Sequence, residues 1–215
     1  MRIAVIGGTG VHGGGLAFRW ARAGFDVLIG SRQAERAASA AADLKQRLPG
    51  VSVSGKANDR AASEADFVVL AVPFAVHAET IRTLHPALGS SIVIDTCVPF
   101  DHDRPGKLKP PHEGSALQEA LHILGPKAKV VAAFQNVPAG ALWELDGHPM
   151  GDCLVCGDDD EAKGLAMTLA SSAGLRAIDI GPATNAHLAE AAAALVDLLN
   201  RRHRRNDIGV QFTLA

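Results

Sequence analysis

Three glycines near the N-terminus have a spacing that is suited to binding a phosphate. Gly8, Gly10 and Gly13 form the pattern G-x-G-x-x-G directly after the apolar residues 3–6, and a helical pattern follows them. In such a turn the first glycine allows a tight reversal, the second lets backbone N–H groups approach a pyrophosphate, and the third allows the helix to pack closely on the strand. The helix N-terminus adds free N–H donors and a positive dipole end. This arrangement predicts a dinucleotide site.

The residues after the second expected strand indicate which dinucleotide is bound. Where NAD-selecting proteins carry an acidic residue, about 20 residues beyond the glycine turn, this chain has Ser31 and Arg32. A hydroxyl and a guanidinium fork suit a 2′-phosphate, and Arg36, one helical turn further on, could add a second cation. Asp26 lies at the opposite end of the strand, too far away to repel that phosphate. We therefore expect NADP rather than NAD; the alternative is that Arg32 is simply exposed to solvent.

Two cysteines, Cys153 and Cys156, form a C-x-x-C sequence of the kind used in thiol redox chemistry and zinc binding. Residues 152–157 have the pattern of a strand, however, and residues three apart in a strand point to opposite faces. We therefore expect two buried core cysteines and predict no metal ligands. His77 and His85 lie in an expected helix and are likewise predicted to be packing or solvated residues.

Strand and helix patterns alternate along almost the whole chain, and the elements they predict must position these residues. Strands are expected near residues 2–6, 26–30, 51–53, 67–72, 91–95, 129–134, 153–156 and 175–180. Helices are expected between them, among them 35–48, 61–65, 160–173 and 185–205. Several strands are continuously apolar, which is typical of strands covered by helices on both faces. The alternation predicts an α/β protein with a Rossmann-like, doubly wound parallel sheet.

The alternation also suggests how the chain is divided. We place a boundary after residue 150, so that residues 1–150 form the dinucleotide-binding domain and 151–215 form a smaller C-terminal α/β domain. Residues 101–114 break the pattern because they contain Pro105, Pro110 and Pro111. A long loop of this kind is either a binding segment or a solvated connection, and both alternatives stay open.

The composition excludes several classes of partner. The 215 residues carry a net charge of −2, so no overall basic field would attract nucleic acid or an acidic membrane surface. The N-terminus has no signal-peptide pattern, and no apolar run approaches the roughly 20 residues needed to cross a bilayer. Three cysteines cannot form a disulfide framework. We therefore expect a cytoplasmic protein that binds small molecules and neither nucleic acid nor membranes.

Beyond the glycine turn and the Ser-Arg pair, motifs along essentially the whole chain resemble those of the NADPH-dependent F420 reductases, also called 8-hydroxy-5-deazaflavin:NADP oxidoreductases. The motifs are Gly7-Gly-Thr-Gly10, Gly30-Ser-Arg32, Val98-Pro99, Val137-Pro-Ala139, Val155-Cys-Gly-Asp-Asp-Asp-Glu161, Gly181-Pro182 and Ile208-Gly209. The resemblance implies a two-domain protein, usually a homodimer, that transfers a hydride between NADPH and the deazaflavin coenzyme F420.

The resemblance also implies which residues form the two sites. Those expected to bind NADP are Gly8, Thr9, Gly10, Val11, His12, Gly13, Ser31, Arg32, Arg36 and, along the nicotinamide half, Val72, Phe74, Val98 and Ala139. Those expected to line the F420 pocket are Val98, Pro99, Gln135, Val137 and Ile208. Because both reacting carbons belong to the bound molecules, the protein has to align two rings and exclude water. We therefore predict no catalytic acid, base or nucleophile.

Two features leave alternatives open. Members of the family often carry a histidine where this chain has Gln135, which cannot become a cation but can hydrogen-bond to a ring carbonyl or hydroxyl. The alternatives are an NADPH-dependent reductase of another acceptor, such as a flavin, an imine or a ferric chelate, and a non-catalytic NADP-binding regulator. The basic residues 201–205 either complement the end of the last helix or attract, with Lys107 and Lys109, the phosphate and glutamate tail of the coenzyme.

Overall fold

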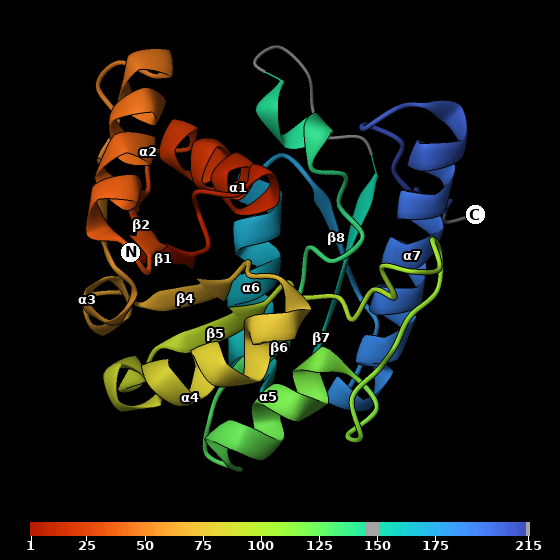
Figure 1. Cartoon of the computed structure of the whole chain (residues 1–215). Coiled ribbons are helices and arrows are strands. Elements are labelled where there is room, and N and C mark those ends of the chain that lie inside the picture. Colours follow the sequence, from red (N-terminus) through yellow and green to blue (C-terminus); the bar gives the residue numbers. More distant parts are fainter. Residues whose placement is uncertain (145–150, 214–215) are drawn as a thin grey trace.

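The computed structural model describes residues 1–144 and 151–213, which form a single sheet with helices on both faces (Figure 1). The eight strands have the order β3-β2-β1-β4-β5-β6-β7-β8. Their bounds are β1 Arg2–Ile6, β2 Asp26–Ser31, β3 Val53–Ala57, β4 Phe67–Leu70, β5 Ile92–Asp95, β6 Val130–Ala132, β7 Asp152–Gly157 and β8 Arg176–Asp179. In this order, the six neighbouring strands from β3 through β2, β1, β4 and β5 to β6 are all parallel, and β7 and β8 are parallel to each other.

The helices divide between the two faces of the sheet. Their bounds are α1 Val11–Arg22, α2 Ala34–Arg47, α3 Asn58–Ser63, α4 His77–Leu88, α5 Ala116–Leu124, α6 Asp160–Ser172 and α7 Ala186–His203. Helices α1, α2 and α6 pack in one hydrophobic core, whereas α3, α4, α5 and the start of α7 pack in the other. Successive residues of β1 alternate between these cores, Ile3 and Val5 in the first and Ala4 and Ile6 in the second. This arrangement confirms the predicted doubly wound α/β fold and explains the continuously apolar strands.

The parallel arrangement that we expected has one exception, because β7 pairs antiparallel with β6. A parallel return needs a crossover segment, which is usually a helix. The described part of the β6–β7 connection instead contains the short 3₁₀ helix η2, Gly140–Trp143. The chain therefore re-enters the sheet at the edge where β6 ends, and β7 runs in the opposite direction.

The C-terminal part of the chain continues the same sheet, since β7 and β8 both follow residue 150. Residues 145–150, next to the expected domain boundary, lie outside the described ranges. The division into residues 1–150 and 151–215 stays a prediction.

Small residues on α1 let the segment after β6 approach the glycine turn closely. A Cβ added at Gly15 would lie 2.7 Å from the Cβ of Leu142. The buried guanidinium of Arg19 donates to the carbonyl of Leu142 at 2.8 Å and to that of Ala141 at 2.9 Å. The indole N–H of Trp143 donates to the Val11 carbonyl at 2.9 Å. These contacts join η2 to the start of α1, so that residues 135–140 reach the same region as the glycine turn.

Replacing Gly55 with alanine is expected to destabilise the protein by about 3 kcal/mol, since overpacking against a backbone cannot be relieved by a rotamer change. An added Cβ would lie 2.1 Å from the carbonyl carbon of Ala37, where α2 packs on β3. Gly164 is the matched control, because it is exposed on α6 and an added Cβ would meet nothing within 4 Å. Urea unfolding should show G164A to be more stable than the wild type by about 0.5 to 1 kcal/mol. Equal stability of G55A and wild type would contradict the close approach.

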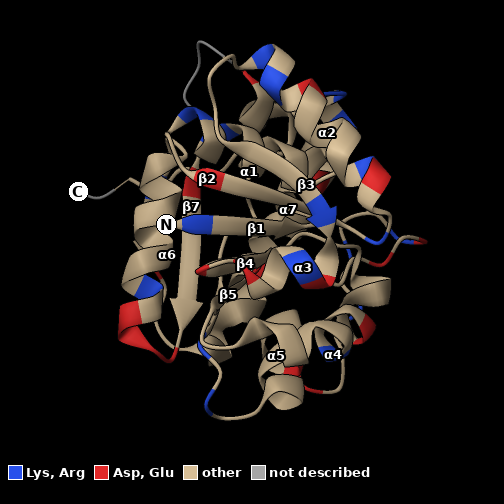
Figure 2. Cartoon of the chain, turned by 90° about the vertical axis from the view of Figure 1, so that its left-hand side faces the viewer, with Lys and Arg blue, Asp and Glu red and all other residues tan. Residues whose placement is uncertain are grey.

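Along the helices of the side shown in Figure 2, Lys and Arg positions are interspersed with Asp and Glu positions. A nucleic-acid surface would be expected to gather basic residues on one face, and this side does not. Among the described residues, no helix combines the length and the apolar character needed to span a bilayer.

Candidate functional site

The glycine turn forms the centre of the site at the carboxyl edge of the sheet. Gly7 carries the tight reversal, with φ of +88°, and a Cβ there would lie 2.3 Å from the Ala71 carbonyl oxygen. The Gly10 N–H donates to the Gly7 carbonyl at 2.9 Å, and α1 begins at the next residue with no acidic side chain in its first turn. The first N–H groups of a helix have no partner within the helix, so they are available to an anion.

The site lies where the strand order reverses. Strands β1 and β4 are neighbours, and the chain continues outward from β1 to β2 and β3 on one side and from β4 to β5 and β6 on the other. In an open α/β sheet, a ligand binds in the crevice at this switch point, outside the carboxyl ends of the strands. The segments after β1, β2, β4, β5 and β6 all contribute residues to the two cavities described next.

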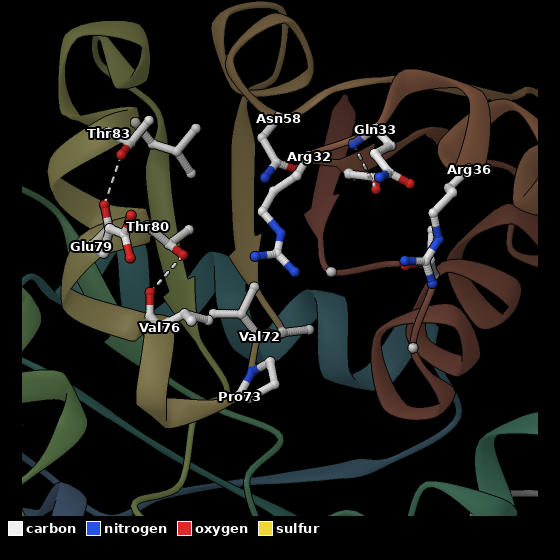
Figure 3. A pocket seen from close by; sticks show the side chains of 16 residues that line it. Arg32, Gln33, Arg36, Asn58, Val72, Pro73, Val76, Glu79, Thr80 and Thr83 are labelled. Carbon is white, nitrogen blue, oxygen red and sulfur yellow. Dashed lines mark hydrogen bonds between the residues drawn. The ribbon is translucent and has the colours of Figure 1, made fainter.

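A first cavity of about 470 Å³ extends from the glycine turn along the end of β2. Arg32 extends from the end of β2 into its centre, between Asn58 and Val72, and faces Thr80 and Glu79 of α4 across the cavity (Figure 3). Its lining residues are Gly7, Thr9, Gly10, Ser31, Arg32, Gln33, Arg36, Asn58, Ala71, Val72, Pro73, Val76, Glu79, Thr80, Thr83 and Leu84. This cavity thus brings together the three residues predicted to recognise a 2′-phosphate.

The polar groups of the first cavity suit a phosphate. Within residues 1–144 and 151–213, neither Arg32 nor Arg36 forms an ion pair. The Ser31 hydroxyl oxygen accepts the Gln33 N–H at 3.2 Å, which leaves its own hydrogen for a ligand. The one nearby carboxylate on β2, that of Asp26, is held at the other end of the strand by Arg2 at 2.7 Å.

A second cavity, of about 750 Å³, adjoins the first. The two share Gly10, Ala71, Val72 and Pro73, so they form a continuous path over the glycine turn and the end of β4. The second cavity is lined largely by apolar groups, among them Phe74, Val98, Val137 and Ala139. Residues of α7 and the exposed residues that follow this helix complete its lining. A path of this size and shape can hold an extended dinucleotide and a second planar molecule.

Most residues that the sequence analysis assigned to the ring site meet in this second cavity. Those that line it are Val72, Phe74, Val98, Gln135, Val137 and Ala139, and the turn residues Val11, His12 and Gly13, which were assigned to NADP, line it as well. Gly8 lines a third, smaller cavity behind the turn. Pro99 and Ile208 are not lining residues of the described cavities. Pro99 is buried, and Ile208 is held by two hydrogen bonds to the side chain of Asn200, which does line the second cavity.

A strained turn after β6 presents Gln135 to the second cavity. Phe134 is fully buried and has φ of +72°, a backbone conformation that costs a residue with a side chain about 1 kcal/mol or more. The amide nitrogen of Gln135 donates to the Asp95 carbonyl at 2.8 Å. Its amide oxygen is buried and has no hydrogen-bond partner among the described residues. That oxygen is therefore suited to accept a hydrogen bond from a ring hydroxyl or N–H group.

His12 contributes its side chain to the site, and not only its backbone in the glycine turn. Burial lowers its pKa to about 4, and a hydrogen bond to the Phe134 backbone only partly opposes this effect. The imidazole is therefore neutral at physiological pH. Its Nε2 atom is buried without a partner in the described structure and its ring lines the second cavity. The sequence analysis expected His12 to bind NADP as part of the glycine turn, and it assigned no role to this side chain.

A buried charge network lies beneath the second cavity. His77 is 0% exposed and its ring nitrogens lie 2.9 Å from an oxygen of Asp95 and 2.6 Å from one of Glu119. The ring also stacks on Phe74, with centroids 5.4 Å apart. Asp95 in turn receives the backbone N–H of Cys97 at 2.9 Å. The network thus supports both Phe74 and the strand end that carries Thr96 to Val98.

Ligand-type atoms of His77, Asp95 and Cys97 lie within 4.8 Å of one another. Both ring nitrogens are already engaged by carboxylates, and the Cys97 thiol points to the carbonyls of Leu70 and Val72. The arrangement therefore fits an imidazolium between two acids rather than a metal ligand set. Sequence reasoning missed this charge network because its members come from three separate elements. The one local signal in the sequence was an aspartate, Asp95, at the end of an apolar strand.

The C-x-x-C cysteines are buried on opposite faces of the sheet, as predicted. Cys153 belongs to the core with α1 and α6, and Cys156 to the core with α4 and α5. Burial raises the pKa of both thiols to about 12. They are therefore protonated core residues that do not converge on a common point.

Comparison with known proteins points to one family. A family model described as NADP oxidoreductase, coenzyme F420-dependent, matches residues 2–99. The F420-dependent NADP reductases of Methanothermobacter thermautotrophicus and Methanocaldococcus jannaschii are 39% and 38% identical to this chain, over 99% of its length and 95% and 98% of theirs. The crystal structure of a proposed F420-dependent NADP reductase from an Arthrobacter species matches with a TM-score of 0.76 and 29% identity, over 99% of this chain and 98% of that one.

Proposed function

Since this chain belongs to the family of the F420-dependent NADP reductases, we propose that it transfers a hydride between NADPH and coenzyme F420, with both rings held in the second cavity. The observation that carries the proposal is the continuity of the two cavities through Gly10, Ala71, Val72 and Pro73. A dinucleotide that reaches Arg32 with its adenosine end can follow this path with its nicotinamide end into a space that is large enough for a second ring.

The NADP half of the proposal assigns one task to each part of the path. Ser31, Arg32 and Arg36 recognise the 2′-phosphate, and the N–H groups at the start of α1 receive the pyrophosphate. Val72, Phe74, Val98 and Ala139 contact the nicotinamide. Gly8, Thr9, Val11, His12 and Gly13 complete the turn around the phosphates.

The chemistry that NADPH and F420 supply is the hydride transfer itself, so the protein has to align them. Val98 and Val137 are apolar groups that exclude water from the reacting rings. Pro99 is buried next to Val98 in the chain, and Ile208 is hydrogen-bonded to Asn200, which lines the same cavity. Holding two rings in reacting contact can contribute several kcal/mol to the rate, on the order of what orientation supplies in other enzymes. Gln135 fixes the orientation of the acceptor ring through its unpartnered amide oxygen. No acid, base or nucleophile is required.

The test is to mix the purified protein with NADPH and F420 and to follow the visible absorbance of the deazaflavin. We expect the absorbance to disappear with one NADPH oxidised for each F420 reduced, and NADH to be much less effective. Riboflavin and FMN serve as control acceptors. Turnover of these flavins without reduction of F420 would favour a different acceptor, and tight NADPH binding without oxidation by any acceptor would favour a regulator.

We also propose a cytoplasmic homodimer that associates through α7. Ala189, Ala193 and Ala194 are buried within the chain, whereas Leu188 and Leu195, seven residues apart, are 50% and 49% exposed. Residues seven apart lie on the same side of a helix, and an exposed apolar stripe of this kind is suited to a second copy of the chain. Sedimentation at micromolar concentration should give the mass of two chains; the mass of one would exclude the dimer.

A further inference from the structure

We propose that Arg204 binds the anionic tail of F420, its phosphate and glutamate groups, at the outer rim of the second cavity. The enzyme would then favour the complete coenzyme over its bare deazaflavin ring. This inference rests on the proposed function and adds to it the recognition of a part of the substrate that does not react. Of the basic residues that we considered for this task, Arg201, Arg204 and Arg205 line the second cavity, whereas Lys107 and Lys109 do not.

The end of α7 gives Arg204 an unusual backbone. The helix ends at His203, and Arg204 follows in the left-handed conformation with φ of +54° and ψ of +42°. Its N–H donates to the Arg201 carbonyl, and the Arg205 N–H donates to the Asn200 carbonyl at 2.9 Å, which closes the last turn. Glycine is the common residue at such a helix end because it adopts this conformation without strain. An arginine there points to a requirement for its side chain.

The charges at the rim leave Arg204 as the cation that is free to bind an anion. Arg201 is paired with Asp197 at 2.7 Å, and the Arg205 guanidinium is held by Asp207, also at 2.7 Å. In the ranges 1–144 and 151–213, Arg204 forms no ion pair. The two pairs cancel in charge, so the surplus positive charge of this part of the rim belongs to Arg204.

The geometry of the cavity also suits a tail at this place. Its inner part is formed by the glycine turn, Val98 and Val137, where the two rings are proposed to meet. The residues that line it after α7, namely Arg204, Arg205 and Asn206, are exposed and form its outer part. A ring bound inside would leave the cavity past this outer part, so a phosphate attached to the ring would pass the guanidinium, which offers a fork of donors to its oxygens.

Complementing the dipole of α7 does not explain why Arg204 lines the cavity. A cation at any position in the last turn would serve that purpose. Arg202 lies in the same turn, is exposed and does not line the second cavity. It therefore provides a matched control for the loss of one positive charge at the end of this helix.

The experiment compares R204N, R204K and R202Q with F420 and with the deazaflavin that lacks the tail, at saturating NADPH. Asparagine is uncharged and tolerates the left-handed backbone, so R204N should fold. We expect R204N to raise KM for F420 about tenfold, the size of one charge-assisted hydrogen bond at an exposed rim. KM for the deazaflavin that lacks the tail should stay unchanged in R204N. R204K should have a KM for F420 between those of the wild type and R204N. The salt dependence of kcat/KM for F420 should become shallower in R204N.

Each other outcome counts against the inference. An unchanged KM for F420 in R204N, or an equal rise for both acceptors, would overturn the role of Arg204 and leave the proposed function intact. If R202Q raised KM for F420 as much as R204N does, the increase would come from a general loss of positive charge, and the specific role of Arg204 would be wrong. If the wild type reduced neither deazaflavin, the proposed function would fail and this inference with it.

Discussion

Replacing Arg32 with glutamate is expected to lower kcat/KM for NADPH by about a hundredfold to a thousandfold and to raise kcat/KM for NADH. The substitution removes a charge-assisted fork of hydrogen bonds, worth about 1.5 to 3 kcal/mol, and adds repulsion between a carboxylate and the 2′-phosphate. The glutamate would also be able to accept a hydrogen bond from the 2′-hydroxyl of NADH, as the acidic residue of NAD-selecting proteins does. The position of Arg32 in the centre of the first cavity is the reason for this large effect (Figure 3).

The control for R32E is R60E, since Arg60 is exposed on α3 and does not line the first cavity. Both variants change the net charge by the same amount, so any difference between them comes from position. Initial rates with NADPH and NADH at fixed acceptor give the two values of kcat/KM. If R32E kept the preference of the wild type for NADPH, Arg32 would not be the residue that recognises the 2′-phosphate.

Replacing His77 with glutamine is expected to destabilise the protein by about 3 kcal/mol near pH 6, because it leaves the buried carboxylate of Asp95 without its cation. Burial alone would lower the pKa of His77, but the charges and hydrogen bonds of Asp95 and Glu119 outweigh it and raise the pKa to about 9. A folded-state pKa above the unfolded value of about 6.5 means that protonation favours the folded state. The contribution is therefore complete below about pH 6.5 and is lost as the pH rises through 9.

The difference in unfolding free energy between wild type and H77Q should accordingly shrink between pH 6.5 and 9, as measured by urea titrations across this range. Glu190, whose pKa burial raises to about 8, also weakens the fold as the pH rises, and because the charge of His77 lowers that pKa, the two groups titrate as a coupled pair. The buried thiol of Cys97, whose pKa burial raises as well, is neutral throughout. His85 is the matched control, since it is exposed on the same helix, and H85Q should show no such pH-dependent difference. A constant difference for H77Q would mean that His77 is uncharged in the folded protein.

The elements of this fold could be predicted because each has a local cause. A strand is present at each of the eight expected places, and the central strands such as β1, β4 and β5 follow from continuous apolar runs that are buried on both faces of the sheet. Their ends shift by a few residues, as in β3, where residues 51–53 were expected and Val53–Ala57 is observed. The antiparallel pairing of β7 could not be predicted, since it depends on the path of the connection and not on the pattern within the strand.

The sequence alone determined which residues could bind a dinucleotide, because the glycine turn and Ser31-Arg32 each act through a short stretch of chain whose geometry follows from its residues. Only the tertiary structure decided which distant residues meet. It joined two cavities over Gly10 and Val72, brought His77 between two carboxylates from other elements, and placed Arg204 but not Arg202 among the residues that line the second cavity. Contacts of this kind depend on how helices pack across the sheet, and no single segment of sequence contains the information that sets them.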